Sequence, residues 1–209
     1  ALGTGLDRIS TYPNIKGSIS LPTNINISNM TLTYATPDSQ NGDPDASAIV
    51  ADTATNSEIK NVKIKGIRPS TASGIAGINI RGLDTTAPKN LKITNCHFEK
   101  VFAGISSRYN ASDISIQNNK FYDVVYGVWF NNNLNNPGNF PPGLLGPQYV
   151  DISHNNFELT YYQAISVEDP NGEFISSYVS SNNNTFVNCG NGTGDHEDQV
   201  QQTPVISFD

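Results

Sequence analysis

The chain has 209 residues and a net charge of −7, yet only 15% of its residues are charged. It contains no cluster of Lys or Arg and no long apolar segment. These features exclude a basic nucleic-acid-binding surface and a membrane-inserted helix. Much of the polarity comes from Asn, Ser, Thr and Gly, and Asn favours turns over helices. We therefore expect many short strands in a single domain.

A frame of alternating apolar residues returns along most of the chain. Residues 1–16 are expected to form a lead-in, and residues 17–209 a single domain. Each copy of the frame is expected to start one coil of this domain. The copies start at residues 25, 62, 91, 114, 150 and 179.

The frame is clearest in the middle of the chain. Residues 90–105 recur as residues 113–128, with the apolar positions and the closing Gly displaced by 23. Apolar residues alternate within each copy, which is the period of strands rather than helices. Fixed-period self-similarity predicts a stacked solenoid, in which differences in coil length fall in loops. The longest inserted loop is expected at residues 131–148.

The shared frame can be written Ile-x-Ile-x-x-Asn-x-Phe followed by Gly-Ile. It resembles the coil pattern of the pectin-lyase-like right-handed β-helix proteins, which include phage tailspikes, pectate lyases and polygalacturonases. The resemblance covers roughly residues 17–209 and is specific for fold, not for activity. It implies an all-β fold: a right-handed, single-stranded parallel β-helix of about six coils, with three sheets and an Asn-rich turn ladder.

The resemblance also assigns roles to the Asn-rich turns. In this family each coil bends between its second and third strands. Asn119, Asn155 and Asn184 are expected to stack in that turn, with their amides hydrogen-bonded along the rod. Cys96 occupies the same column one coil earlier, and His154 replaces an Asn in the neighbouring turn column. We interpret these residues as architectural.

Two cysteines are too few for a disulfide scaffold. Cys96 and Cys189 lie three coils apart in the predicted stack. This is about 14 Å at roughly 4.8 Å per rung, which exceeds the reach of a disulfide. We expect two free thiols without a redox role.

A further strand follows the Gly of each coil, for example at residues 78–81 and 128–131. Alternation directs its first and third residues inward and its second and fourth outward. This sheet is expected to be exposed. One outward column contains Val50, Asn79, Ser106, Trp129, Ser166 and Ser207, and the other contains Asp52, Arg81, Arg108, Asn131, Glu168 and Asp209.

Trp129 is the only Trp in the chain. Two interpretations of it stay open. An exposed ring on this sheet can stack on the apolar C–H face of a sugar. Alternatively, the insertion at 131–148 covers the ring.

The second outward column contains the remaining candidate site residues. Arg81 and Arg108, together with Asn131, are candidates for binding an acidic glycan; weak surface ion pairs are the alternative. Glu168 and Asp209, on adjacent rungs, are a candidate carboxylate pair for glycoside hydrolysis; ordinary surface acids are the alternative. No metal-ligand spacing is evident, so no metal and no cofactor are expected.

The motifs typical of polygalacturonases and the Asp cluster of pectate lyases are missing. The chain most resembles bacteriophage tailspike and tail-fibre β-helix domains. The resemblance implies a homotrimer on the virion surface, or an extracellular protein, that recognises a host-surface polysaccharide, with depolymerisation left open. A secreted polysaccharide lyase or glycoside hydrolase, and a structural virion rod without a sugar site, are the alternatives.

Overall fold

The computed structural model describes residues 19–33, 47–67, 76–82, 87–108, 110–131, 146–168, 177–190 and 206–208. Within these ranges every regular element is a β-strand, and every strand pairing is parallel. The described part of the chain contains no helix that could cross a membrane. The chain therefore forms the parallel β-helix that the repeat predicts. The expected lead-in, residues 1–16, lies outside the described residues.

The first sheet, sheet A, takes one strand from each coil. Its neighbours in space are separated in sequence by whole coils, which is the topology of a solenoid. The strands, in spatial order, are β1 (Ile19–Ser20), β3 (Ser47–Val50), β5 (Ala76–Arg81), β8 (Ala103–Arg108), β11 (Tyr126–Asn131), β14 (Ile165–Glu168) and β17 (Ile206–Phe208).

The second sheet, sheet B, has two arms that are joined where the long strands β2 and β4 pass from one arm to the other. The first arm contains β2 (Asn26–Thr33), β4 (Thr55–Lys65), β6 (Lys89–Thr94), β9 (Ser112–Gln117), β12 (Gln148–Ser153) and β15 (Ser177–Asn182). The second arm continues from β4 through β7 (His97–Glu99), β10 (Lys120–Val124), β13 (Asn156–Thr160) and β16 (Thr185–Val187). With sheet A, these arms give each coil the three strands that the resemblance implied.

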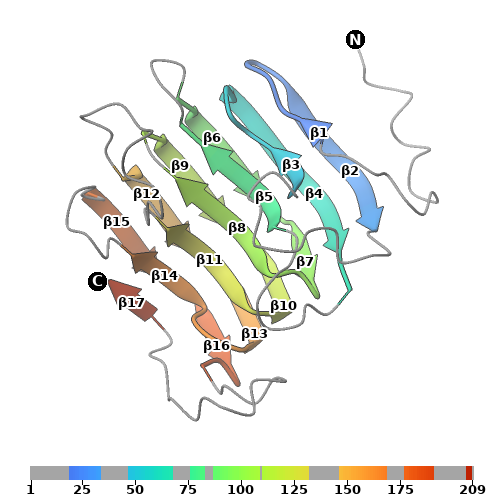
Figure 1. Cartoon of the computed structure of the whole chain (residues 1–209), viewed down its shortest axis with the longest axis vertical. Coiled ribbons are helices and arrows are strands. Elements are labelled where there is room, and N and C mark those ends of the chain that lie inside the picture. Colours follow the sequence, from blue (N-terminus) through green and yellow to red (C-terminus); the bar gives the residue numbers. More distant parts are fainter. Residues whose placement is uncertain are drawn as a thin grey trace, which may run out of the picture.

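Figure 1 shows the coils stacked along the rod, from the blue strands β1 and β2 at one end to the red strands β15 and β16 at the other. The interior is a set of apolar columns, one residue per coil. In the first arm, for example, Ile59, Ile93, Ile116 and Ile152 are register partners and are fully buried. Apolar burial along such columns is the main favourable term for the fold.

A stack of phenylalanines runs through the second arm. Phe98, Phe121 and Phe157 are fully buried, and successive ring centroids lie 4.9 and 4.6 Å apart. The rings need space at the corner that leads into sheet A. A Cβ on Gly104 would lie 2.4 Å from the Phe121 ring, and a Cβ on Gly127 would lie 2.5 Å from the Phe157 ring. This close approach explains why Gly follows Phe98 and Phe121 in the sequence; after Phe157 the corresponding residue is Ala164.

A buried ladder of asparagines joins neighbouring coils at the turn between the two arms. The Cys96 amide donates to Asn119 Oδ1 at 2.8 Å, the Asn119 amide to Asn155 Oδ1 at 2.9 Å, and the Asn155 amide to Asn184 Oδ1 at 2.8 Å. Each Asn side chain also donates to a backbone carbonyl, as Asn155 does to Ile116 at 2.9 Å. The predicted ladder is confirmed, and Cys96 stands in its column.

The residue before each ladder position has a left-handed backbone. Asn95, Asn118, His154 and Asn183 have φ between 53° and 58°, a region that Asn tolerates better than most residues. His154 Nε2 lies 3.5 Å from the Asn183 side-chain amide. His154 therefore substitutes for an Asn, as predicted.

One expected coil start was wrong. Val62–Ile64 does not share the slot of Leu91–Ile93, because Ser57 and Ile59 are the register partners of Leu91 and Ile93. Asn61, with φ of 54°, bends β4 before Val62, and Ile64 then pairs with Phe98 in the second arm. The sequence frame failed in this coil because a polar residue, Ser57, fills an apolar position.

Ser57 is buried, and its hydroxyl has partners in its own coil and in the preceding one. Its single proton lies within reach of two carbonyls, those of Pro22 and Thr55, each at 3.1 Å, and its oxygen accepts from the Ile25 amide at 3.3 Å. A buried hydroxyl with partners costs little, so the coil tolerates the exchange.

Asn155→Ala should lower the free energy of unfolding by roughly 2–4 kcal/mol, because it leaves the Asn119 amide and the Ile116 carbonyl buried without their side-chain partner. Urea denaturation followed by circular dichroism measures the change. Asn182→Ala is the matched control, since Asn182 is an exposed Asn at the end of β15, beside the corresponding turn of the next coil. Equal stability of the two variants would contradict the structural role of the ladder.

Candidate functional site

The register of sheet A brings most of the predicted site residues onto neighbouring rungs. Arg81 pairs with Arg108, and Asn131 pairs with Glu168. Trp129 stands between Ser106 on one side and Ser166 on the other. For Arg81, Arg108, Asn131 and Glu168 this placement concerns the backbone. Asp209, the expected partner of Glu168, lies outside the described residues.

The expectation that the column through Trp129 is exposed was wrong for every other member whose side chain the structure describes. Asn79 and Ser166 have 0% exposure, and Val50 and Ser106 have 9%. Ser106 donates from Oγ to Asn79 Oδ1 at 3.2 Å. Neighbouring rungs thus bond to each other along this column, which satisfies buried polar atoms without solvent.

Trp129 is the half-buried exception in that column, and it belongs to an aromatic cluster. Its ring is stacked on Tyr126, with centroids 4.9 Å apart and planes 12° apart. Phe102 meets the Trp129 ring edge-on at 5.5 Å. The Tyr162 ring is stacked on Tyr126, with centroids 5.4 Å apart. We call Phe102, Tyr126, Trp129 and Tyr162 the Trp129 cluster.

The Trp129 cluster gathers aromatics from the corner between the second arm and sheet A in three successive coils. Phe102 directly precedes β8, Tyr126 is the first residue of β11, and Tyr162 lies shortly before β14. All four rings are half-buried, and burial raises the pKa of the Tyr162 hydroxyl above its ordinary value. The rings hold one another in place, so their accessible parts are pre-ordered for a ligand. The sequence analysis found Trp129 but missed its three neighbours, although their coil positions were available from the repeat.

Whether the insertion covers Trp129 is a separate matter. Residues 132–145, which form most of the expected loop at 131–148, lie outside the described residues. Both interpretations of Trp129 therefore stay open with respect to this loop, and the half-buried state of the ring is what the described chain establishes.

On the outer face of the second arm, charged side chains form ion pairs with one another. Glu99 accepts ion pairs from Lys63 at 3.1 Å and Lys65 at 3.0 Å, and Lys120 pairs with Glu158 at 3.4 Å. Burial alone would raise the pKa of Glu99, but hydrogen bonds from Lys65 and Lys63 hold it below its ordinary value. Such pairs contribute little stability individually, and we assign them no ligand.

His97 lies in the same face. Burial, followed by the positive charge of Lys63, lowers the pKa of His97 below its ordinary value. The imidazole therefore stays neutral at physiological pH and does not add to the positive charge of its lysine neighbours.

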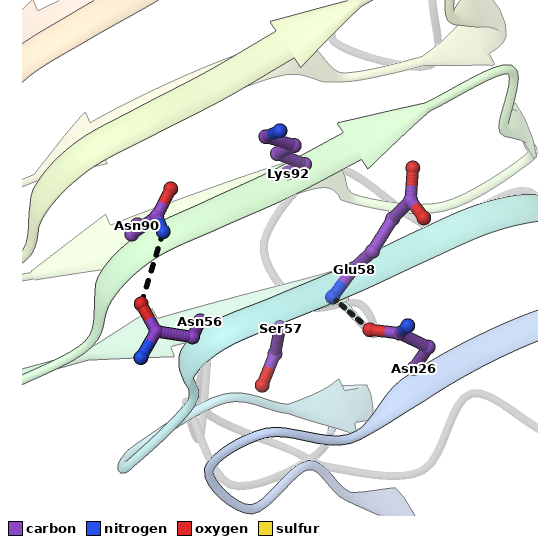
Figure 2. A pocket seen from close by; sticks show the side chains of 6 residues that line it. All are labelled: Asn26, Asn56, Ser57, Glu58, Asn90 and Lys92. Carbon is purple, nitrogen blue, oxygen red and sulfur yellow. Dashed lines mark hydrogen bonds between the residues drawn. The ribbon is translucent and has the colours of Figure 1, made fainter.

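The outer face of the first arm carries a polar hollow that the sequence analysis did not anticipate. Figure 2 shows Asn56 and Asn90 on one side of it and Glu58 with Asn26 on the other. Ser57 and Lys92 complete the lining. The Asn90 side chain donates to Asn56 Oδ1 at 2.9 Å, and Asn26 Oδ1 accepts from the Glu58 amide at 2.9 Å.

The same face carries a pair of exposed tyrosines at its other end. Tyr149 and Tyr178 are 57% and 74% exposed. Their rings are stacked with centroids 4.7 Å apart and planes 3° apart. The sequence analysis did not separate this pair from the other tyrosines, because nothing in the frame marks their position as outward.

Comparison with known proteins decides the family. A family model described as "Right handed beta helix region" matches residues 16–199, which is most of the chain. The chain belongs to the right-handed β-helix family. The match gives the right-handed winding that the resemblance implied. This winding agrees with the general preference of connections between parallel strands for right-handed crossovers. In a search of curated proteins no sequence matches this β-helix.

Two solved structures of the surface adhesin PfbA from Streptococcus pneumoniae share the fold. One aligns with a TM-score of 0.57 and 16% identity over 82% of this chain and 61% of its own. The other has a TM-score of 0.54 and 17% identity over 82% of this chain and 50% of its own. The β-helix thus spans about half to three fifths of these adhesin chains.

A pectate lyase, Bsp165PelA from Bacillus sp. N165 in complex with trigalacturonate, aligns over 95% of this chain and 90% of its own at 16% identity. Its TM-score of 0.24 is too low to support an argument about function.

Both cysteines of the β-helix are unpaired, as predicted. Cys96 is buried in the ladder column, where burial raises the pKa of its thiol to about 11. Cys189 is partly exposed near the last described coil. Among the described residues, no group of three His, Cys, Asp or Glu side chains is arranged to hold a metal ion.

At pH 8 in the folded β-helix, iodoacetamide should alkylate Cys189 and leave Cys96 unmodified, because the thiolate is the reactive form and burial suppresses it. Peptide mass spectrometry after brief labelling distinguishes the two residues. Both should react in denaturant. Rapid labelling of Cys96 in the folded protein would contradict its burial.

Proposed function

We propose that this β-helix is an extracellular or virion-surface module that recognises a polysaccharide, and that the Trp129 cluster provides the sugar contact. The observation that carries the proposal is the cluster itself. A half-exposed Trp, stacked on Tyr126 and held by Phe102, is positioned beside sheet A. Aromatic faces of this kind pack on the apolar C–H face of pyranose rings.

The rigidity of the cluster supports the proposal. Three of the four rings come from successive coils whose backbones are joined beside them: the Tyr126 amide donates to the Phe102 carbonyl at 2.8 Å, and the Tyr162 amide to the Val125 carbonyl at 3.0 Å. These hydrogen bonds hold the coils, and with them the rings, at a fixed spacing. A ligand that binds pre-ordered rings loses less of its binding free energy to side-chain ordering. Arg81, Arg108 and Asn131 belong to strands of the same sheet, and we propose that they supply polar contacts to an acidic glycan.

The surface adhesin of similar fold agrees with an extracellular location, but at 16–17% identity the likeness concerns the fold. The assignment to a bacteriophage tailspike, and with it the homotrimer, remains a prediction from the coil pattern. A purely structural rod is the alternative that the binding experiment below would favour if no glycan bound.

Cleavage of the polysaccharide is a second candidate function, and the register of β14 favours it. Glu168 lies two residues beyond Ser166, the rung partner of Trp129, and pairs with Asn131. Hydrolysis needs two carboxyl groups that flank the glycosidic bond, and Asp209 is the proposed second group.

Trp129→Ala should weaken binding on a glycan array by at least about tenfold, because it removes the stacking surface. Trp129→Phe is the matched control, since it keeps an aromatic face and should retain most of the affinity. Both variants are checked for folding by circular dichroism. Folded Trp129→Ala with wild-type affinity for every glycan would contradict the proposed site.

Glu168→Gln should abolish any depolymerisation while leaving binding intact, because the amide keeps the shape of the side chain but cannot transfer a proton or attack. Viscometry and reducing-end assays on each polysaccharide bound by the wild type measure cleavage. Unchanged cleavage by Glu168→Gln would assign the chemistry to other residues.

A further inference from the structure

We propose that the outer face of the first arm of sheet B is a second polysaccharide-binding surface, separate from the Trp129 cluster. The Tyr149–Tyr178 pair would supply the aromatic contact, and the hollow around Asn56, Glu58 and Lys92 the hydrogen bonds. The proposal shares only its ligand class with the proposed function, and it concerns a different sheet.

The tyrosine pair is unusual in both exposure and backbone. Among the large hydrophobic residues of the described chain, only Tyr149 and Tyr178 are more than half exposed. Neither phenol hydroxyl has a hydrogen-bond partner within the described chain, and the two rings are stacked on each other. Two adjacent rings therefore present apolar surface and free hydroxyls to solvent.

Both tyrosines hold a left-handed backbone, with φ of 53° for Tyr149 and 57° for Tyr178. The same turn column carries Asn or Asp, also with positive φ, in the other coils: Asn24, Asn56, Asn90 and Asp113. Asn adopts this conformation more readily than Tyr does. The two tyrosines therefore destabilise the backbone at positions where the other coils carry Asn or Asp. Residues held in such conformations cluster at functional sites.

The hollow offers a mixture of donors and acceptors. Glu58 and Lys92 are rung partners, yet no ion pair joins them. The Glu58 carboxylate accepts only a long hydrogen bond from Thr94, at 3.5 Å, and the Lys92 ammonium has no partner within the described chain. Figure 2 shows both side chains extending from neighbouring strands beside the Asn56–Asn90 amide pair.

This combination suits a neutral, hydroxyl-rich chain. Carboxylate, ammonium and amide groups together can donate to and accept from sugar hydroxyls. The charges on this face balance, since its lysines, Lys60, Lys89 and Lys92, are matched in number by its acids, Glu58, Asp113 and Asp151. Asp113 is paired with Lys89 at 3.9 Å. The face therefore has no excess of positive charge to hold an acidic polymer.

The separation of the two parts sets the size of the ligand. Asn90 precedes Leu91 in β6, and Tyr149 belongs to β12, with β9 between these strands. Two rungs correspond to about 10 Å along the rod. A single sugar ring does not span this distance, so we infer a linear oligosaccharide that runs along the turn column.

The test uses the folded full chain and a double variant, Tyr149→Asn with Tyr178→Asn. Asn is the residue that this column already carries in other coils, so the double variant should fold with equal or higher stability. The probes are immobilised neutral β-glucan and galactan hexasaccharides. We expect dissociation constants to rise about tenfold relative to the wild type.

The hollow is tested with Glu58→Gln and Lys92→Met, which preserve side-chain shape, and each should weaken binding several-fold. Val187→Asn is the control, because Val187 is an exposed apolar residue, 43% accessible, on the second arm. A folded tyrosine double variant with wild-type affinity would overturn the proposal, as would a wild type that binds no neutral hexasaccharide.

The outcome separates the two surfaces. If Trp129→Ala alone abolishes binding and the tyrosine double variant has no effect, the Trp129 cluster is the site and the second surface is refuted. If the tyrosine double variant weakens binding while Trp129→Ala does not, the second surface stands and the proposed function of the Trp129 cluster fails.

Discussion

The buried hydrogen bonds along Asn119, Asn155 and Asn184 fix the relation between neighbouring coils, and the other structural features depend on that relation. Each Asn side chain accepts from a backbone amide of the preceding coil and donates to a backbone carbonyl of that same coil. A polar group in such a buried position is costly unless it is fully paired. The paired state therefore selects one register, and the same register aligns the stacked phenylalanines.

That register gives the three outer faces different chemistry. The second arm pairs its charges internally, as Glu99 does with Lys63 and Lys65. Sheet A buries much of the polar column beside Trp129, where Ser106 bonds to Asn79. The first arm leaves Lys92 without a partner and two tyrosines largely exposed. Polar and aromatic groups that are open to ligands thus gather at the Trp129 cluster and along the first arm.

The fold was predictable because its determinants recur at fixed intervals. The Asn and Phe of each turn, and the Gly that admits the Phe ring, are visible as a repeated frame. The coil that contains Ser57 was misplaced because a hydroxyl stands at an apolar position of the frame, with a partner, the Pro22 carbonyl, that is distant in sequence. Sequence patterns do not reveal such long-range partners. Because this coil was misplaced, Lys63 was assigned to the wrong arm, and its ion pair with Glu99 was not predicted.

The candidate site was predicted only in part. Alternation along sheet A placed Trp129 outward correctly, but it gave no information on what covers Asn79 and Ser166. Contacts between coils also decided which aromatics join Trp129: Phe102 and Tyr162 lie 27 and 33 residues away in sequence, respectively. The pairing of Arg81 with Arg108 and of Asn131 with Glu168 was recovered, because parallel register follows directly from the repeat.

Because Trp129 is the only Trp in the chain, its fluorescence reports directly on the central claim that this ring contacts sugar. The measurement is a titration of the protein with a bound oligosaccharide, with acrylamide quenching before and after saturation. The account predicts a saturable change in emission and reduced quenching as the sugar covers the half-exposed ring. Saturable binding with no change in either signal would contradict recognition at the Trp129 cluster.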